Sequence, residues 1–119
     1  MSIQPLRVGT IILPSSDNAG NSLGPEHRRL RSILGHTFGG FTSTNGQGFW
    51  IDPASGDEHA EPVVVYQIAA VWSPALCLQL RTVAARAASF ARQKCVYIDT
   101  PLTGVEFVPP AANIYEESA

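Results

Sequence analysis

The run from Val63 to Val71 constrains the fold of this chain most, because every residue in it except Gln67 is apolar. A nearly continuous apolar run of this length is typical of a strand that is buried inside a sheet. Ser73 and Pro74 follow it, and these residue types are favoured at the N-cap and in the first turn of a helix. The sequence therefore predicts an inner strand that leads directly into a helix.

The predicted helix after Pro74 has a single apolar face. Its members are spaced four, three, four and three residues apart: Leu76, Leu80, Val83, Ala87 and Phe90. An earlier strand and helix precede this pair. Residues 6–14 are rich in β-branched residues, and a helix opens at Gly24-Pro25-Glu26 and ends at Gly39-Gly40.

The remaining segments complete the element order. Residues 41–62 predict either one bent strand or two short ones, with a tight step at Asn45-Gly46 and a turn at 53–57. Residues 94–98 predict the last core strand, and 101–108 are suited to a short return strand. This β-α-β-β-α-β order predicts an α+β fold of the ferredoxin-like split β-α-β type, with two helices on one face of an antiparallel sheet and room for an extra C-terminal strand.

Residues 1–108 are predicted to form a single domain, and residues 109–119 a loosely ordered tail. The sheet face that the helices do not cover would expose apolar surface, which predicts a homo-oligomer, a dimer or higher. The N-terminus does not resemble a signal peptide, and no apolar run approaches the ~20 residues of a membrane span. We therefore expect a cytoplasmic protein with no membrane contact. Cys77 and Cys95 lie in apolar patterns and are predicted to be reduced, buried thiols.

Motifs of known catalytic or metal sites do not occur in the sequence. There is no G-x-S-x-G elbow, no HExxH, no paired CxxC and no complete calcium loop. His27 and His36 are nine residues apart on one predicted helix, so they point to different sides and do not form a chelating pair. From these absences we expect a protein that is not an enzyme and that has no catalytic residue, metal or cofactor.

A glycine-rich segment at residues 39–50 combines flexible backbone, small polar side chains and aromatic rings. Its amides could face an anion and its rings could stack on a base. We predict stacking by Phe41, Phe49 or Trp50 and polar contacts by Thr42 and Asn45. The alternative interpretation is a helix cap, a hairpin turn and aromatic residues that pack in the core.

Seven of the eight cations fall in or at the end of the two predicted helices: Arg28, Arg29, Arg31, Arg81, Arg86, Arg92 and Lys94. If both helices cover one face, that face is basic and would attract a small anionic or nucleotide ligand or an acidic host protein. The alternative is a solvated helix exterior. A net charge of −2 disfavours duplex nucleic acid as the partner. For phosphate binding we select Arg28, Arg29 and Arg31.

Several short elements between residues 8 and 98 resemble a family of small uncharacterised proteins of tailed phages and prophages. The pattern is FGGFT at 38–42, GxGxW at 46–50 and EPVxxYQ at 61–67, preceded by IILP at 11–14 and DNAG at 17–20 and followed by QKCVY at 93–97. Phe49 departs from the pattern, since relatives tend to have a small residue there. The resemblance implies a phage setting, the host cytoplasm and a dispensable accessory function.

The sequence thus leads to the hypothesis of a non-enzymatic phage accessory protein, of the counter-defence kind, that binds and sequesters a small nucleotide-type anionic ligand. The main alternative is a protein–protein inhibitor of a host or defence protein. A nucleotide-processing enzyme and a minor virion component are the weaker alternatives.

Overall fold

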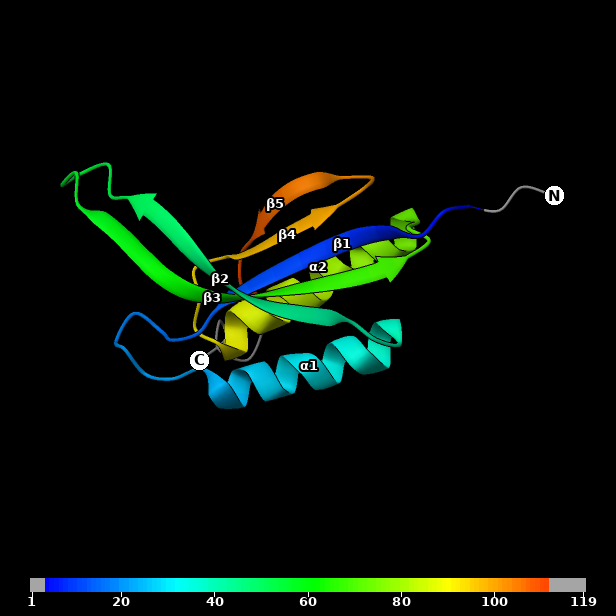
Figure 1. The fold of residues 1–119 in the computed structure, drawn as a ribbon, viewed down its shortest axis with the longest axis horizontal. Helices are drawn as coiled ribbons and strands as arrows, with labels where there is room; N and C mark the ends of the chain where they lie inside the picture. Colours follow the sequence, from blue (N-terminus) through cyan, green and yellow to red (C-terminus); the bar gives the residue numbers. More distant parts are fainter. Residues whose placement is uncertain (1–3, 112–119) are drawn as a thin grey trace, which may run out of the picture.

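The computed structural model describes residues 4–111 of the chain. Their elements, in chain order, are β1 (Arg7–Pro14), α1 (Gly24–Phe38), β2 (Thr42–Ile51), β3 (Glu58–Ala70), α2 (Pro74–Phe90), β4 (Val96–Thr100) and β5 (Gly104–Val108) (Figure 1). Most of the predicted tail lies outside the described residues. Its described beginning is attached to α2, because the backbone N–H of Ala111 donates to the carbonyl of Ala85 at 3.0 Å.

The strands form one five-stranded sheet in the order β2-β3-β1-β4-β5, and every neighbouring pair is antiparallel. The first four strands have the spatial order of a ferredoxin-like fold, so the predicted fold class is confirmed. The C-terminal return strand is present as β5 at one edge. The apolar strand β3 is an inner strand, as predicted, and β1 lies at the centre of the sheet.

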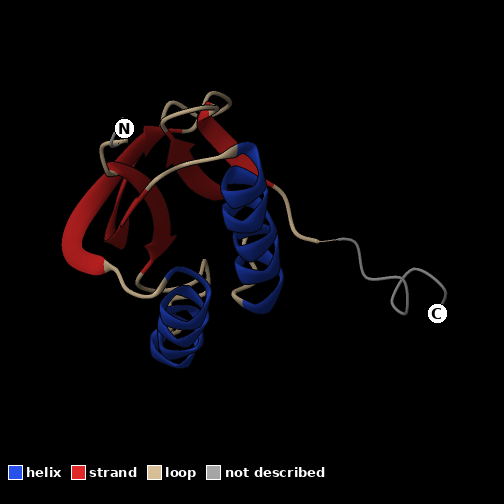
Figure 2. Ribbon diagram, turned by 90° about the vertical axis from the view of Figure 1, so that its right-hand side faces the viewer, coloured by secondary structure: helices blue, strands red, loops and turns tan. Residues whose placement is uncertain are grey.

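Both helices lie on the same side of the curved sheet (Figure 2). Alternate residues of each strand point toward them, as Ile11 and Leu13 do from β1 and Tyr66 and Ile68 do from β3, and all four are fully buried. The helices contribute most of the remaining core, which includes Leu30, Leu34, Leu80, Val83, Ala84, Ala87 and Ala88. Within residues 4–111, no helix covers the other side of the sheet, which we call the open face.

The β2–β3 hairpin turns at the predicted residues 53–57, but strand β2 runs straight through the Asn45-Gly46 pair. Asn45 and Gly46 lie inside β2, opposite Val64 and Val63, so the expected tight step at this pair is wrong. The chain turns at residues 52–57, where the backbone N–H of Asp52 donates to the carbonyl of Asp57, so the turn predicted at 53–57 is confirmed. The pairing of β2 with β3 continues on both sides of the Asn45-Gly46 pair, from Thr42 to Ile51, and it overrides the local turn preference.

Strand β3 includes Pro62, which the sequence analysis placed before the strand. Strand β1 pairs with β3 only as far as Val63, and next to it the Pro62 carbonyl accepts from the backbone N–H of Ser15 at 2.9 Å. The nitrogen of Pro62, which carries no hydrogen, faces the same side of the strand, where β1 has already ended. A proline at this position therefore removes no ladder hydrogen bond.

The cysteines have different environments. Cys77 is buried in α2, as expected, but Cys95 is exposed, so the prediction of a buried thiol is wrong for Cys95. Cys95 lies in the short connection between α2 and β4, and only the next residue, Val96, enters the core. None of the helices in residues 4–111 is both long and apolar enough to span a bilayer.

Candidate functional site

A hollow of about 430 Å³ lies on the open face of the sheet. In Figure 1 the outer part of the β2–β3 hairpin bends to the upper left, and the β4–β5 hairpin lies to the right of it, in the upper part of the view. Residues from both hairpins, from β1 and from two loops line the hollow: Ile12, Pro14, Asn18, Trp50, Glu61, Val63, Gln93, Lys94, Cys95, Tyr97 and Phe107. Its volume is in the range of small-molecule sites.

The GxGxW element of β2 shapes one side of this hollow. Gly46, Gly48 and Trp50 occupy alternate positions of the strand, so they share the open face. A Cβ atom on Gly48 would lie 3.5 Å from Val63 Cγ1 and 3.6 Å from Glu61 Cγ. The absence of two side chains therefore leaves space above β3, and Trp50 limits this space at its outer end.

Aromatic rings stand on both sides of the hollow. The ring of Trp50 stacks on His59 across the strands, with centroids 4.3 Å apart and planes 17° apart. On the other side Tyr97 and Phe107 meet edge to face, with centroids 5.7 Å apart. Trp50 is 49% exposed and Phe107 is 64% exposed, so both rings retain free surface. Such rings can stack on a planar heteroaromatic group or contact a cation through their faces.

The hollow also carries charges of both signs. Glu61 of β3 and Lys94 of the α2–β4 connection both line it. Asn18 and Gln93 add amide groups that can donate and accept hydrogen bonds. This combination suits a ligand with a flat ring system, a cationic centre and an anionic group.

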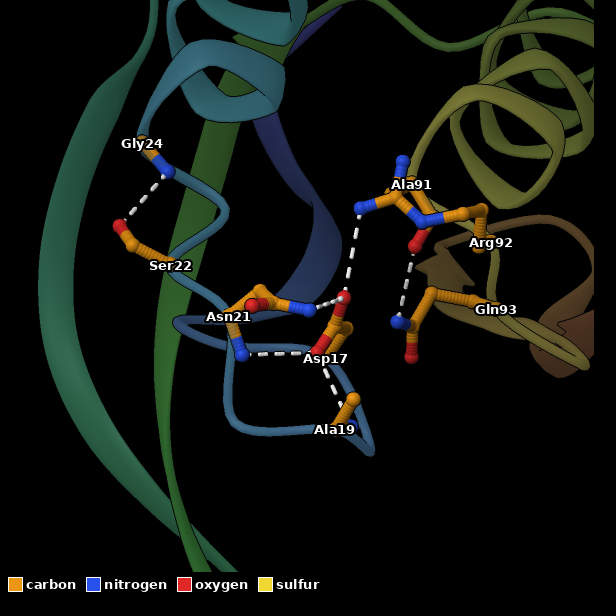
Figure 3. Close-up of polar contacts among 8 residues, drawn as sticks. All are labelled: Asp17, Ala19, Asn21, Ser22, Gly24, Ala91, Arg92 and Gln93. Atoms are coloured by element: carbon orange, nitrogen blue, oxygen red, sulfur yellow. Dashed lines mark hydrogen bonds and ion pairs between the residues drawn. The ribbon is translucent and has the colours of Figure 1, made fainter.

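Two connections that line the hollow are attached to each other (Figure 3). In the β1–α1 loop the Asp17 carboxylate accepts from the backbone N–H groups of Ala19, at 3.0 Å, and Asn21, at 2.8 Å. The side-chain amide of Asn21 donates to it at 3.2 Å, and Arg92 of the α2–β4 connection donates at 3.3 Å. The N–H of Asn21 is the main cause that lowers the pKa of the Asp17 carboxyl; burial opposes it, and Arg92 lowers the pKa further.

The structure separates the site residues that were selected from the sequence. Of the eight, Trp50 is the one that lines this hollow. Phe41 and Thr42 line a second hollow of about 500 Å³ on the open face, beside the FGGFT element. Asn45 and Phe49 alternate with the open-face residues of β2, so they point to the opposite side of the strand.

The arginines of α1 lie on the helix-covered side of the molecule, away from Trp50. Arg28 and Arg31 are exposed there, and Arg29 lies over the ring of Phe90 with its Cζ atom 4.6 Å from the centroid. The expected single site of α1 arginines with Trp50 is therefore not assembled in the chain.

Carboxylates of the chain also neutralise part of the predicted basic surface. Arg81 bonds to Glu106 at 2.7 Å, and Arg92 bonds to Asp17 at 3.3 Å. Both pairs link a helix, or the residues that follow it, to a distant segment. These two arginines have a structural partner, which weakens the argument for an anion-binding helix face.

His27 is buried, which was not predicted from the sequence. Nε2 of His27 lies 2.7 Å from the Pro14 carbonyl, which can only accept, so Nε2 carries the proton. Nδ1 then accepts from the hydroxyl of Tyr66 at 2.6 Å. Burial raises the pKa of Tyr66, and the charge of Arg31 opposes this shift. The signal in the sequence was the position of His27, three residues before Leu30 on the apolar side of α1.

Residues 4–111 contain no group of three His, Cys, Asp or Glu side chains arranged to hold a metal ion. The fold and the hollow thus define a ferredoxin-like α+β protein with an open-face site suited to a small organic ligand.

No protein-family model matches the chain, and no curated protein matches it. Solved structures do match. A phage SAM lyase in complex with S-methyl-5′-thioadenosine has a TM-score of 0.63 and 9% identity, over 89% of this chain and 84% of that one. A phage SAM lyase in the apo state has a TM-score of 0.60 and 9% identity, over 89% and 83%. At this identity the likeness shows a shared fold.

The comparison overturns the expectation that the chain is not an enzyme. That expectation rested on missing catalytic motifs, and a lyase has the same fold over most of its length. The absence of a familiar motif on this scaffold therefore gives no reason to exclude catalysis.

Proposed function

We propose that this chain is an enzyme that binds S-adenosylmethionine in the open-face hollow and cleaves it to S-methyl-5′-thioadenosine. The observation that carries the proposal is the composition of the hollow, in which Trp50, Tyr97 and Phe107 surround a space that Glu61 and Lys94 also line. The fold shared with phage SAM lyases supports the same assignment.

Each part of S-adenosylmethionine has a chemical match in the hollow. Adenine is a planar ring system that can stack on an aromatic side chain, worth about 1–3 kcal/mol per base. The sulfonium is a cation that aromatic faces and the Glu61 carboxylate would attract. The amino-acid carboxylate would be attracted to the ammonium of Lys94, which lies on the other side of the hollow.

The proposed reaction breaks the bond between the sulfonium sulfur and Cγ of the methionyl group. Sulfur takes the electron pair and becomes a neutral thioether, which leaves with the adenosyl and methyl groups. The remaining four-carbon unit either closes to a lactone, by attack of its own carboxylate on Cγ, or loses a proton from Cβ and forms a double bond. Both routes balance without water or a second substrate.

Glu61 would act differently in these two routes. In the elimination, a base must accept the Cβ proton, and Glu61 is the carboxylate that lines the hollow among the described residues. In the lactone route the substrate supplies its own nucleophile. Glu61 then only binds the sulfonium, and the aromatic rings hold the reacting atoms close together.

We also propose a phage setting, which the resemblance to tailed-phage proteins and the phage origin of the solved structures support. Destruction of a methyl donor would deprive host methylation reactions of their substrate, which is a counter-defence role in the host cytoplasm. We also propose a homo-oligomer. Val8 and Val105 are 51% and 54% exposed on the open face and do not line the proposed site, and a second copy of the chain would cover such a surface.

Incubation of the purified chain with S-adenosylmethionine, followed by mass spectrometry, tests the proposal. We expect S-methyl-5′-thioadenosine above the spontaneous background of a buffer sample, together with either the lactone or the unsaturated amino acid. Glu61→Gln should lower kcat/KM by at least about tenfold, because it removes a charge that faces the sulfonium. Glu58→Gln, on the same strand but away from the hollow, should have no effect. A wild-type rate equal to the background would overturn the proposal.

A further inference from the structure

We infer that Asp17 and Arg92 are positioning residues of the proposed active site. Their ion pair fixes the α2–β4 connection against the β1–α1 loop, and this connection places Lys94 and Cys95 at the hollow. The inference rests on the proposed function for its kinetic test. Its structural basis is independent, because the pair and the lining residues are properties of the free chain.

The Asp17 carboxylate is held by its own loop, independently of Arg92. Two backbone N–H groups and one side-chain amide of its own loop donate to the carboxylate, and its side chain is 10% exposed. The next residue, Asn18, lines the hollow. A carboxylate held in this way is rigid, so a side chain that bonds to it is held in a fixed position relative to the loop.

Arg92 has an unusual backbone conformation for its residue type. Its φ is 55°, in the left-handed region, where non-glycine residues are strained. The backbone N–H of Gln93 donates to the carbonyl of Ala88, and that of Arg92 donates to Ser89, which is the Schellman pattern at the end of α2. Glycine is the usual residue at this position. An arginine here lacks that backbone advantage, and its guanidinium instead reaches Asp17 (Figure 3).

The three residues after Arg92 all line the hollow: Gln93, Lys94 and Cys95. The connection that carries them is held at its two ends, by α2 and by β4, and the ion pair adds the link from its side. Without the link, Lys94 would sample more positions, and its attraction to an anionic group of the ligand would weaken. The chemical step at the sulfonium, on the side of Glu61, would change less.

The test compares Arg92→Gly, Arg92→Lys and Asp17→Asn with Arg86→Ala as the control on the exposed side of α2. We expect KM for S-adenosylmethionine to rise about threefold to fivefold in Arg92→Gly and Asp17→Asn, with kcat nearly unchanged, since a partly exposed ion pair makes only a small contribution. Arg92→Lys should restore part of the loss. Glycine relieves the backbone strain, so Arg92→Gly should unfold at an equal or higher urea concentration, which excludes a general loss of stability.

The rate at which a thiol reagent labels Cys95 in the ligand-free protein gives a second readout. We expect labelling to be at least about twofold faster in Arg92→Gly, because a looser connection turns the thiol, which lines the hollow, toward solvent more often. Unchanged labelling together with an unchanged KM would overturn the inference. If the wild-type protein formed no product, the labelling rates alone would decide it: faster labelling would support the link, and equal rates would overturn it.

Discussion

Trp50 and Phe107 lie on the two opposite edge strands of the sheet, yet they line the same hollow. Neighbouring strands are about 4.8 Å apart, so in a flat sheet the two edges would be separated by roughly 19 Å. In the protein the outer part of the β2–β3 hairpin is bent out of line with the rest of the sheet, toward the upper part of the view where the β4–β5 hairpin also lies (Figure 1). The shape of the sheet, rather than a single motif, thus creates the candidate site.

Trp50→Ala should weaken binding of S-methyl-5′-thioadenosine by about 1–3 kcal/mol, because it removes a stacking surface from the wall of the hollow. Isothermal titration calorimetry measures the change. The matched control is Phe49→Ala, which removes the neighbouring exposed ring on the opposite side of the strand. We expect Phe49→Ala to bind like the wild type. If Phe49→Ala lost affinity and Trp50→Ala kept it, the ligand would bind on the side of β2 that carries Phe49 and not on the open face.

Gly48→Val should abolish most of the ligand affinity without loss of stability. A valine side chain on this face would extend over Val63 and Glu61 into the hollow, and β-branched residues are favoured in strands. Urea denaturation should give an equal or higher midpoint, and calorimetry should show at least about tenfold weaker binding. Gln47→Val, on the other side of β2, is the control and should leave affinity unchanged. Wild-type affinity in Gly48→Val would show that the ligand binds elsewhere.

The fold could be predicted because its determinants are local. The apolar run of β3, the Ser73-Pro74 helix start and the single apolar face of α2 each specify one element, and the element order then selects the topology. The extent of β2 could not be predicted. The Asn45-Gly46 pair favours a turn in isolation, and its place inside the strand depends on pairing with β3.

The candidate site depends on which residues share a face across strands that are distant in sequence. Trp50 could be selected from its own segment, because aromatic rings beside glycines are a local signal. Glu61, Lys94 and Tyr97 gave no such signal, and only the register of the sheet brings them to one hollow. The arginines were assigned to the site on charge alone, and the structure places them on the opposite side.

Tyr66→Phe should destabilise the protein by about 1–3 kcal/mol, because Nδ1 of the buried His27 would lose its donor. The pKa of Tyr66 is raised in the folded state, so the folded chain holds this proton more tightly. The stabilisation is complete below the unfolded pKa of about 10 and is lost as pH rises through the raised pKa. In urea titrations the difference between wild type and Tyr66→Phe should therefore shrink above pH 10. A difference that stayed constant up to pH 11.5 would contradict this explanation.

Gly9→Ala should destabilise the protein by about 1–3 kcal/mol. The added Cβ would overlap the ring of Trp72, which is buried and donates from Nε1 to the Arg7 carbonyl at 2.9 Å. Gly35→Ala in α1 is the opposite case, because its Cβ would meet nothing within 4 Å. Alanine is favoured over glycine in a helix by roughly 0.5–1 kcal/mol, so Gly35→Ala should be stabilising. Thermal denaturation of both variants measures the contrast, and a stable Gly9→Ala would show that Trp72 can move aside.

The rate of thiol labelling at Cys95 tests the location of the ligand most directly. Cys95 is exposed and lines the hollow, whereas Cys77 is buried in α2 and should react slowly. Saturating S-methyl-5′-thioadenosine should slow the labelling of Cys95 at least about tenfold, and the Cys95→Ser variant should show no ligand-dependent reaction. If calorimetry showed binding while the labelling rate of Cys95 did not change, the ligand would not lie in the open-face hollow.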